Sequence, residues 1–201
     1  MPSDPTFPTS CWPDAALGPV AVAAVVGMRS EARLLPPGLP HGVAGASAAG
    51  ARAQARRLIA DGARALASIG IAGGLDPALD PGDVVVGSVV ETASGPIAAN
   101  DVWLCRLLNA LPEARAGRIH APGPALGSPA DKRARFEATG AIAVDMESGA
   151  VAEEAARAGL PFAVIRVVAD PAGRGLPPAA MAGLDSEGNT RPGAVLAALL
   201  R

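Results

Sequence analysis

Apolar runs alternate with mixed segments along the first third of the chain. From Pro19 to Met28 the sequence PVAVAAVVGM is nearly all apolar, which is typical of a strand buried on both faces of a sheet. Residues Ser47 to Asp61 interleave small and charged residues, and this pattern predicts a helix. A second apolar run, Ala63 to Ala72, leads into glycines. The pattern therefore predicts a strand, a helix and another strand in succession.

The rest of the chain continues this alternation. The segment LDPALDPGD contains two Asp-Pro pairs and a Pro-Gly pair, which predict a turn, and the valine-rich DVVVGSVVE after it predicts a strand. Further strands are predicted over Gly117–Ala121, residues 141–145 and Phe162–Ala169, and helices over Val102–Leu111, Ala130–Ala138 and Met146–Ala158. Alternating strands and helices favour a three-layer α/β fold, with a mainly parallel or mixed central sheet flanked by helices. A ligand site is expected beyond the carboxyl ends of the strands.

Length and composition fit a single domain. The chain has 201 residues, of which 50% are hydrophobic and 18% are charged. The first twenty residues contain five prolines and no apolar segment of the kind that a signal peptide needs. We expect a flexible N-terminal arm over residues 1–18, one domain over residues 19–201, and a cytoplasmic location. The net charge of −2 gives no basic field for a phosphate backbone, so nucleic acid is not an expected partner.

Acidic residues follow three of the predicted strands. Glu31 comes after the first strand, Asp145 and Glu147 follow AIAV, and Asp170 follows FAVIRVVA. General acid and base catalysis needs carboxylates that converge on one cleft from rigid elements, and this placement predicts such a cleft. Each residue also has a simpler interpretation, as a helix cap, a first-turn charge, a turn former or a solvated helix residue.

Two further features lie inside or at the end of a strand. Arg166 interrupts an apolar strand, where an unpaired charge would be costly, so we predict a structural ion pair with a nearby carboxylate. The glycines of Gly70–Gly74 would let the backbone approach a ligand closely, or would form a tight turn. This segment matches neither the GxGxxG fingerprint nor a P-loop, which argues against a dinucleotide site.

The remaining nucleophiles and metal ligands match no known pattern. His41 and His120 are isolated in the sequence, so we expect no metal site. Ser148 lies in Glu-Ser-Gly-Ala rather than in a GxSxG nucleophile elbow, which argues against a serine hydrolase.

Three segments together resemble the nucleoside phosphorylase and nucleosidase superfamily. They are VVGMRSEARLL (Val25 to Leu35), GIAGGLDPALDPGDVVVGSVV (Gly70 to Val90), and AIAVDMESGAVAEEAARAGLPFAVIRVVADPAGRGLP (Ala141 to Pro177). The resemblance covers most of the chain in matching order. It implies an enzyme that cleaves the N-glycosidic bond of a purine nucleoside, needs no cofactor, uses phosphate or water as co-substrate, and forms a homo-oligomer.

The resemblance also implies roles for individual residues. Asp170 would protonate or hydrogen-bond N7 of the departing purine, and Glu31 would activate the attacking water. Glu147 would accept hydrogen bonds from the ribose hydroxyls and Met146 would pack against the sugar. The other implied substrate-binding residues are Ala72, Gly73 and Asp145.

Within the superfamily the chain is most similar to the hopanoid-associated phosphorylase branch. The shared stretches are Gly-Ile-Ala-Gly-Gly-Leu-Asp-Pro and the Asp-Pro-Ala-Gly-Arg-Gly-Leu-Pro segment from Asp170 to Pro177. This similarity implies removal of adenine from adenosylhopane in bacterial hopanoid biosynthesis, so the substrate would carry a lipid 5′ substituent. The alternatives are a methylthioadenosine/adenosylhomocysteine nucleosidase and a non-catalytic nucleoside-binding subunit.

The chain departs from the superfamily pattern at two places. Hexameric phosphorylases hold phosphate with an Arg and a Ser, and the corresponding residues here are Ser68 and Ile71. Arg29 and Arg33 could substitute, or could be surface charges, so hydrolysis and phosphorolysis both remain open. The loop over Pro122 to Leu126 lacks the aromatic residue that stacks on the purine in many relatives, and its apolar residues would suit a greasy 5′ group.

Overall fold

The computed structural model describes residues 21–123 and 126–175. The arm predicted over residues 1–18 lies outside the described residues, as does the part of the predicted domain beyond residue 175. The described strands are β1 (Val22–Val26), β2 (His41–Val43), β3 (Ala65–Gly74), β4 (Val84–Thr92), β5 (Gly95–Ala98), β6 (Arg115–His120), β7 (Ala143–Val144) and β8 (Phe162–Asp170). The described helices are α1 (Arg29–Ala32), α2 (Ala48–Ala60), α3 (Asp101–Ala110), α4 (Pro129–Thr139) and α5 (Ser148–Arg157).

The described strands form one mixed sheet. Their order is β2-β1-β3-β7-β6-β4-β5, and β8 pairs with both β3 and β4. The pairs β1–β2, β1–β3, β3–β8, β4–β6 and β6–β7 are parallel, whereas β3–β7, β4–β5 and β4–β8 are antiparallel. The predicted α/β fold with a mixed central sheet is confirmed.

Three short elements were missed by the sequence patterns. They are α1, β2 and β5, which have four, three and four residues. Elements this short contain at most two periods of any hydrophobic pattern, so periodicity does not detect them. Both short strands depend on a neighbour for their hydrogen bonds: β2 adds to the edge of β1, and β5 folds back on β4 as a hairpin.

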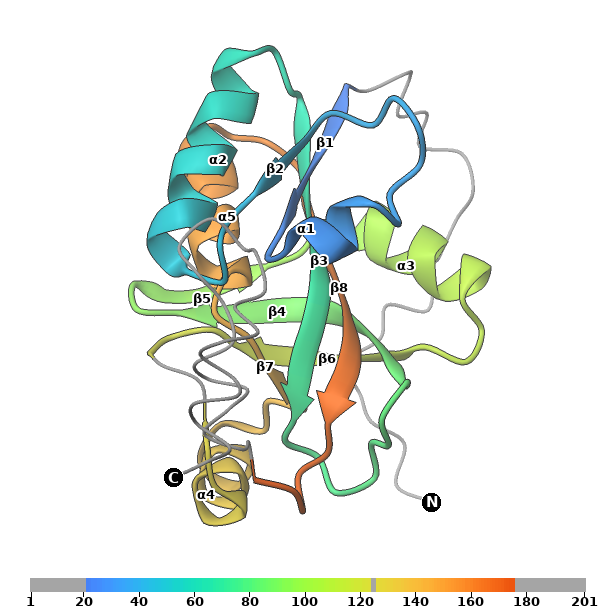
Figure 1. Ribbon diagram of the computed structural model, residues 1–201, viewed down its shortest axis with the longest axis vertical. Coiled ribbons are helices and arrows are strands. Elements are labelled where there is room, and N and C mark those ends of the chain that lie inside the picture. Colours follow the sequence, from blue (N-terminus) through green and yellow to red (C-terminus); the bar gives the residue numbers. More distant parts are fainter. Residues whose placement is uncertain (1–20, 124–125, 176–201) are drawn as a thin grey trace, which may run out of the picture.

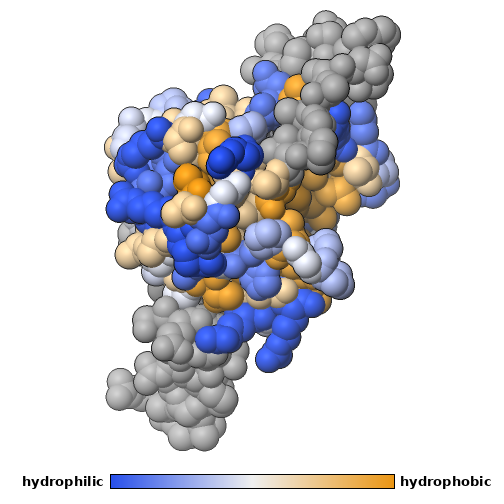
Figure 2. Space-filling model, turned by 90° about the horizontal axis from the view of Figure 1, so that it is seen from above, coloured by the Kyte–Doolittle hydropathy of each residue, from blue (hydrophilic) through white to orange (hydrophobic). Residues whose placement is uncertain are grey.

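Helices cover both faces of the sheet (Figure 1). α2 and α5 pack together on one face and α3 lies on the other, while α4 lies at the end of the sheet where β3 and β8 terminate. Ion pairs join the two packed helices, such as Arg52 to Glu153 at 2.7 Å. Seen from above, hydrophilic residues gather on the side where α2 lies (Figure 2). The longest described helix, α2, has 13 residues, so no described helix can cross a membrane, which takes about 20.

The core between these layers is aliphatic. Its larger buried side chains are Val25, Leu58, Leu66, Val85, Val90, Ile119, Val151, Phe162 and Val164. The helices α2, α3 and α4 begin where the sequence offers a cap: the side chains of Ser47, Asn100 and Ser128 each accept a hydrogen bond from a backbone N–H of the first turn. Apolar strands and capped helices therefore form where the sequence predicts them.

The sheet has a gap beside the middle of β3. β1 pairs with β3 as far as Ile69, and β7 joins the same region only at Gly73. Residues 70–72 are thus left without a strand between β1 and β7, while β8 continues on their other side. Because β1, β3 and β8 are parallel, the carboxyl end of β1 reaches this gap, and β3 and β8 run past it to end at Gly74 and Asp170.

Candidate active site

Glu31 lies at the mouth of the gap. It occupies the first turn of the short helix α1, and its Oε2 accepts a hydrogen bond from the backbone N–H of Met28 at 2.8 Å. Its Oε1 accepts from the N–H of Ile71 at 3.0 Å, 40 residues further along the chain. The carboxylate therefore takes the position that a neighbouring strand would otherwise fill, and it is fixed by two separate elements.

Glu147 approaches the same point from the start of α5. A methyl group built on Gly27 would lie 3.3 Å from Oε1 of Glu147 and 3.3 Å from Oε2 of Glu31. The two carboxylate oxygens are thus separated by no more than twice this distance. Only glycine at position 27 leaves the space between them free, so the structure brings together two of the predicted site residues.

The Glu147 carboxyl has an unusual affinity for its proton. Burial, followed by the charges of Asp145 and Glu31, raises its pKa to about 7, although the Arg166 guanidinium acts in the opposite direction. The group is therefore close to half ionised at neutral pH. Strongly raised pKa values are common at sites that bind or transform a ligand.

This pKa predicts a pH dependence of stability that Glu147→Gln abolishes. Because the folded-state pKa lies above the unfolded value, the protein loses stability as the pH rises from about 4.5 through 7. The shift corresponds to about 3 kcal/mol of unfolding free energy across that interval. We expect urea unfolding to show the variant gaining about 3 kcal/mol relative to wild type between pH 4.5 and pH 8. If the difference in unfolding free energy between the variant and wild type does not change with pH, the pKa of Glu147 is not raised in the folded protein.

Arg166 finds its predicted partner in Asp145. Arg166 Nε lies 2.5 Å from Oδ2 of Asp145, and its terminal nitrogen donates to Oγ of Ser68 at 2.6 Å. The Ser148 hydroxyl donates to Oδ1 of Asp145 at 2.7 Å. Both side chains of the ion pair are only 1% exposed. The Asp145 carboxylate, predicted to bind substrate, is thus buried and accepts hydrogen bonds from Arg166 and Ser148.

Asp170 lies beyond Glu31 along β3. It ends β8 opposite Gly73, and a methyl group on Gly73 would lie 3.3 Å from its Oδ2. The three residue steps from Gly70, which contacts Glu31, to Gly73 span about 10 Å along a strand. This spacing leaves room for a sugar and the five-membered ring of a purine between the two carboxylates. Ala72 and Gly73 form the backbone along that space.

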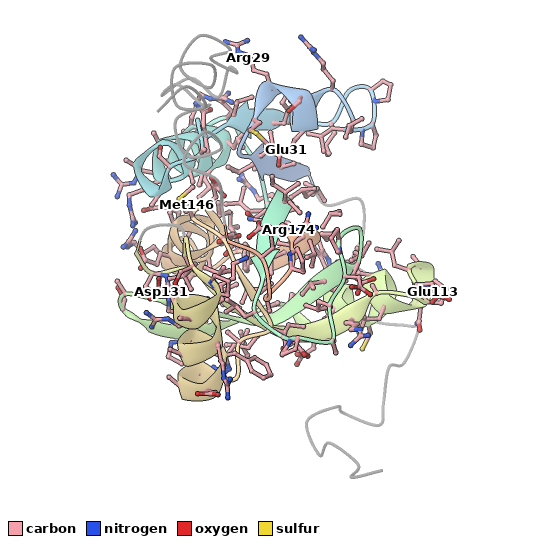
Figure 3. The ribbon with its side chains drawn as sticks, turned by 60° about the horizontal axis from the view of Figure 1, so that its bottom comes forward. Arg29, Glu31, Glu113, Asp131, Met146 and Arg174 are labelled. Atoms are coloured by element: carbon pink, nitrogen blue, oxygen red, sulfur yellow. The ribbon has the colours of Figure 1, made fainter. Side chains whose placement is uncertain are left out.

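Met146 lies between the two acidic residues of the β7–α5 turn and is half buried. In Figure 3, Met146 and Arg174 lie between Glu31 on α1 and Asp131 on α4. Met146 also directly precedes Glu147 in the chain, so the predicted sugar contact lies next to one of the two carboxylates.

The positions that hold phosphate in hexameric phosphorylases offer no anion ligand here. Ser68 is fully buried and its hydroxyl oxygen already accepts from Arg166. Ile71 is apolar and its side chain is 47% exposed. Arg29 and Arg33 are exposed on or just after α1, and Figure 3 shows Arg29 pointing outward from the helix.

Sequence reasoning missed two residues near the site. Lys132 of α4 is fully buried and contacts the Asp170 carboxylate, although a lysine in a charged helix gives no signal of burial. Phe136, one turn further along, packs with Leu75, Val144 and Leu126 in a small apolar cluster beside Gly73. The loop over Pro122 to Leu126, which has no aromatic residue of its own, thus contributes to the same cluster as Phe136 of α4. Two residues of that loop, 124 and 125, lie outside the described residues.

Comparisons with known proteins give a consistent result. The model of a family described as the phosphorylase superfamily matches residues 38–201. No curated protein matches the chain. Among solved structures, S-adenosylhomocysteine nucleosidase from Streptococcus pyogenes, in complex with 5-methylthiotubericidin, is similar with a TM-score of 0.71 and 20% identity. The similarity covers 79% of this chain and 86% of that one.

Two other solved structures have the same fold. The 5′-methylthioadenosine/S-adenosyl homocysteine nucleosidase of Campylobacter jejuni has a TM-score of 0.68 at 18% identity, covering 90% of this chain and 96% of that one. A futalosine hydrolase mutant from Helicobacter pylori has a TM-score of 0.68 at 17% identity, covering 76% of this chain and 86% of that one.

Proposed function

Because the chain belongs to the phosphorylase superfamily, we propose that it hydrolyses the N-glycosidic bond of a purine nucleoside. The observation that carries this proposal is the pair of carboxylates, Glu31 and Glu147, on either side of Gly27, with Asp170 at the end of β8 opposite Gly73 of β3. A site for glycosidic cleavage needs a base, a group that holds the sugar and an acid for the leaving group, in that spatial order.

Each of the three carboxylates has one role in the proposed hydrolysis. Asp170 gives its proton to N7 of the purine, and the electron pair of the bond between sugar and base leaves with N9. The oxygen of a water molecule forms a bond to the anomeric carbon, and Glu31 takes a proton from that water. Glu147 accepts hydrogen bonds from the ribose hydroxyls, and its negative charge favours the oxocarbenium-like sugar of the transition state. Exchange with solvent then returns a proton to Asp170 and removes one from Glu31.

Water is the proposed co-substrate because the gap is built for a base rather than for an anion. Glu31 projects into it with both oxygens fixed by backbone N–H groups. An incoming phosphate would meet two carboxylates there, and like charges in a partly buried site repel strongly. Ser68 is fully buried, so its hydroxyl is not available to hold phosphate.

For the 5′ group we propose the hopane side chain of adenosylhopane. The stretches that the chain shares with the hopanoid-associated branch, residues 70–77 and 170–177, support this choice. Methylthioadenosine and adenosylhomocysteine, whose nucleosidases share the fold, are the alternative substrates.

The decisive experiment measures adenine release from adenosylhopane and from methylthioadenosine, each with and without phosphate. We expect release from adenosylhopane at a rate that phosphate does not change. Release only in the presence of phosphate would contradict hydrolysis. Release from neither nucleoside, together with measurable nucleoside binding, would favour a non-catalytic binding subunit.

Glu31→Gln tests the proposed base. We expect kcat for adenine release to fall by about 10²-fold, because an amide cannot take a proton from water. The variant also loses one of the two backbone hydrogen bonds, since the amide nitrogen cannot accept one. Glu113→Gln, an exposed change far from the gap, is the matched control and should retain full activity. A Glu31→Gln variant within threefold of wild type would exclude Glu31 as the base.

A further inference from the structure

Lys132 is the one buried residue of α4 among those that the structure describes, and it carries a charge. Its side chain is 0% exposed, whereas its neighbours Asp131 and Arg133 are exposed. An ammonium group rarely occupies such a position unless each of its protons has an acceptor. The helix is therefore anchored by the polar contacts of Lys132 in addition to the apolar packing of Phe136.

The acceptors all belong to the segment that ends β8. Nζ of Lys132 donates to Oδ2 of Asp170, to the carbonyl oxygen of Pro171 at 3.0 Å and to that of Arg174 at 3.0 Å. The Asp170 carbonyl oxygen lies 3.4 Å away. One ammonium thus holds both the turn after β8 and one oxygen of the carboxylate that precedes it.

We infer that Lys132 is the positioning residue for the general acid. This inference rests on the proposed function. By occupying Oδ2, Lys132 leaves Oδ1 as the oxygen that carries the proton to the purine. By fixing the turn from residue 170 to 174, it also holds that oxygen 3.6 Å from the position of a methyl group on Gly73 and prevents the carboxylate from rotating away.

The geometry makes the effect specific to the leaving group. A misplaced acid slows departure of a purine that needs protonation at N7, such as adenine. It has much less effect on a purine that leaves readily without a proton, because the transition state then gains little from the acid. A purely structural role of Lys132 would lower both rates equally.

The experiment compares adenosylhopane and methylthioadenosine with the same nucleosides carrying 6-chloropurine in place of adenine. For the substrate that wild type cleaves, we expect Lys132→Met to lower kcat with adenine about 30-fold and with 6-chloropurine by less than about threefold. KM should change little in either case. Arg133→Met, one residue away on the exposed face of α4, is the matched control and should leave both rates unchanged.

Lys132→Gln serves if the methionine variant does not fold, because it removes the charge and keeps an N–H donor on a side chain shorter by one atom. Equal losses on the two leaving groups, or no loss on either, would overturn the assignment of Lys132 while leaving the proposed function intact. A wild-type protein that cleaves none of the four nucleosides would overturn both. Circular dichroism of each variant separates lost positioning from lost structure.

Discussion

Asp170→Asn is expected to lower kcat for adenine release by about 10³-fold with little change in KM. Asparagine has the same shape as aspartate but no acidic proton, so N7 of the leaving purine is no longer protonated. Its amide oxygen can still accept from Lys132, which keeps the turn from residue 170 to 174 in place. The measurement is steady-state adenine release at saturating nucleoside, with the variant's fold checked by its unfolding midpoint.

The control for this substitution is Asp76→Asn. Asp76 also lies in a turn at the end of a strand, where its side chain accepts from the backbone N–H of Ala78 at 2.8 Å. This hydrogen bond is local to its own turn and does not involve Asp170, so we expect unchanged kcat. If Asp170→Asn keeps more than a tenth of wild-type activity, another group must protonate the purine, and the proposed mechanism would need revision.

Arg166→Met is expected to destabilise the protein by about 3–5 kcal/mol, because it leaves the buried carboxylate of Asp145 without its cation. Arg166 and Asp145 are both 1% exposed, so water cannot replace the lost partner. The loss should lower the thermal midpoint on the order of 10 °C for a chain of this size. Differential scanning calorimetry at neutral pH measures it.

A double variant isolates the cause. Arg166→Met with Asp145→Leu removes both charges, and we expect it to recover most of the stability lost by the single change. Arg133→Met, whose side chain is exposed on α4, should leave the thermal midpoint unchanged. If the double variant does not regain stability, the hydrogen bonds to Ser68 and Ser148, rather than the buried charge, contribute most to the stability of this network.

Asp170→Asn and Arg166→Met together distinguish a residue that acts in catalysis from one that stabilises the site. Asp170 lies at the gap and its replacement should affect catalysis far more than stability. Arg166 lies behind the gap, and its loss should affect stability first. It should also raise the pKa of Glu147 further, since the guanidinium is the main group that lowers it. The pH dependence of stability of Arg166→Met would therefore extend to higher pH than that of wild type.

The sequence by itself determined the order of the long elements and the residues that could carry chemistry. Apolar runs over Pro19–Met28 and Phe162–Ala169 predicted buried strands because burial on both faces excludes polar side chains, and β1 and β8 lie within or close to them. Glu31, Glu147 and Asp170 could be selected because carboxylates after buried strands reach the same edge of a sheet. The need of Arg166 for a partner also followed from the cost of a buried charge.

Only the tertiary structure decided which of these groups meet. Asp145, two residues from Glu147, became the partner of Arg166 because the turn after β7 directs it behind the gap, whereas Glu147 faces Gly27. The gap itself exists because β7 pairs antiparallel with β3 only from Gly73 onward, a register that no local pattern encodes. Lys132 is buried because β8 ends beside α4. Local patterns record burial and periodicity, but contacts between distant residues depend on strand order, direction and register.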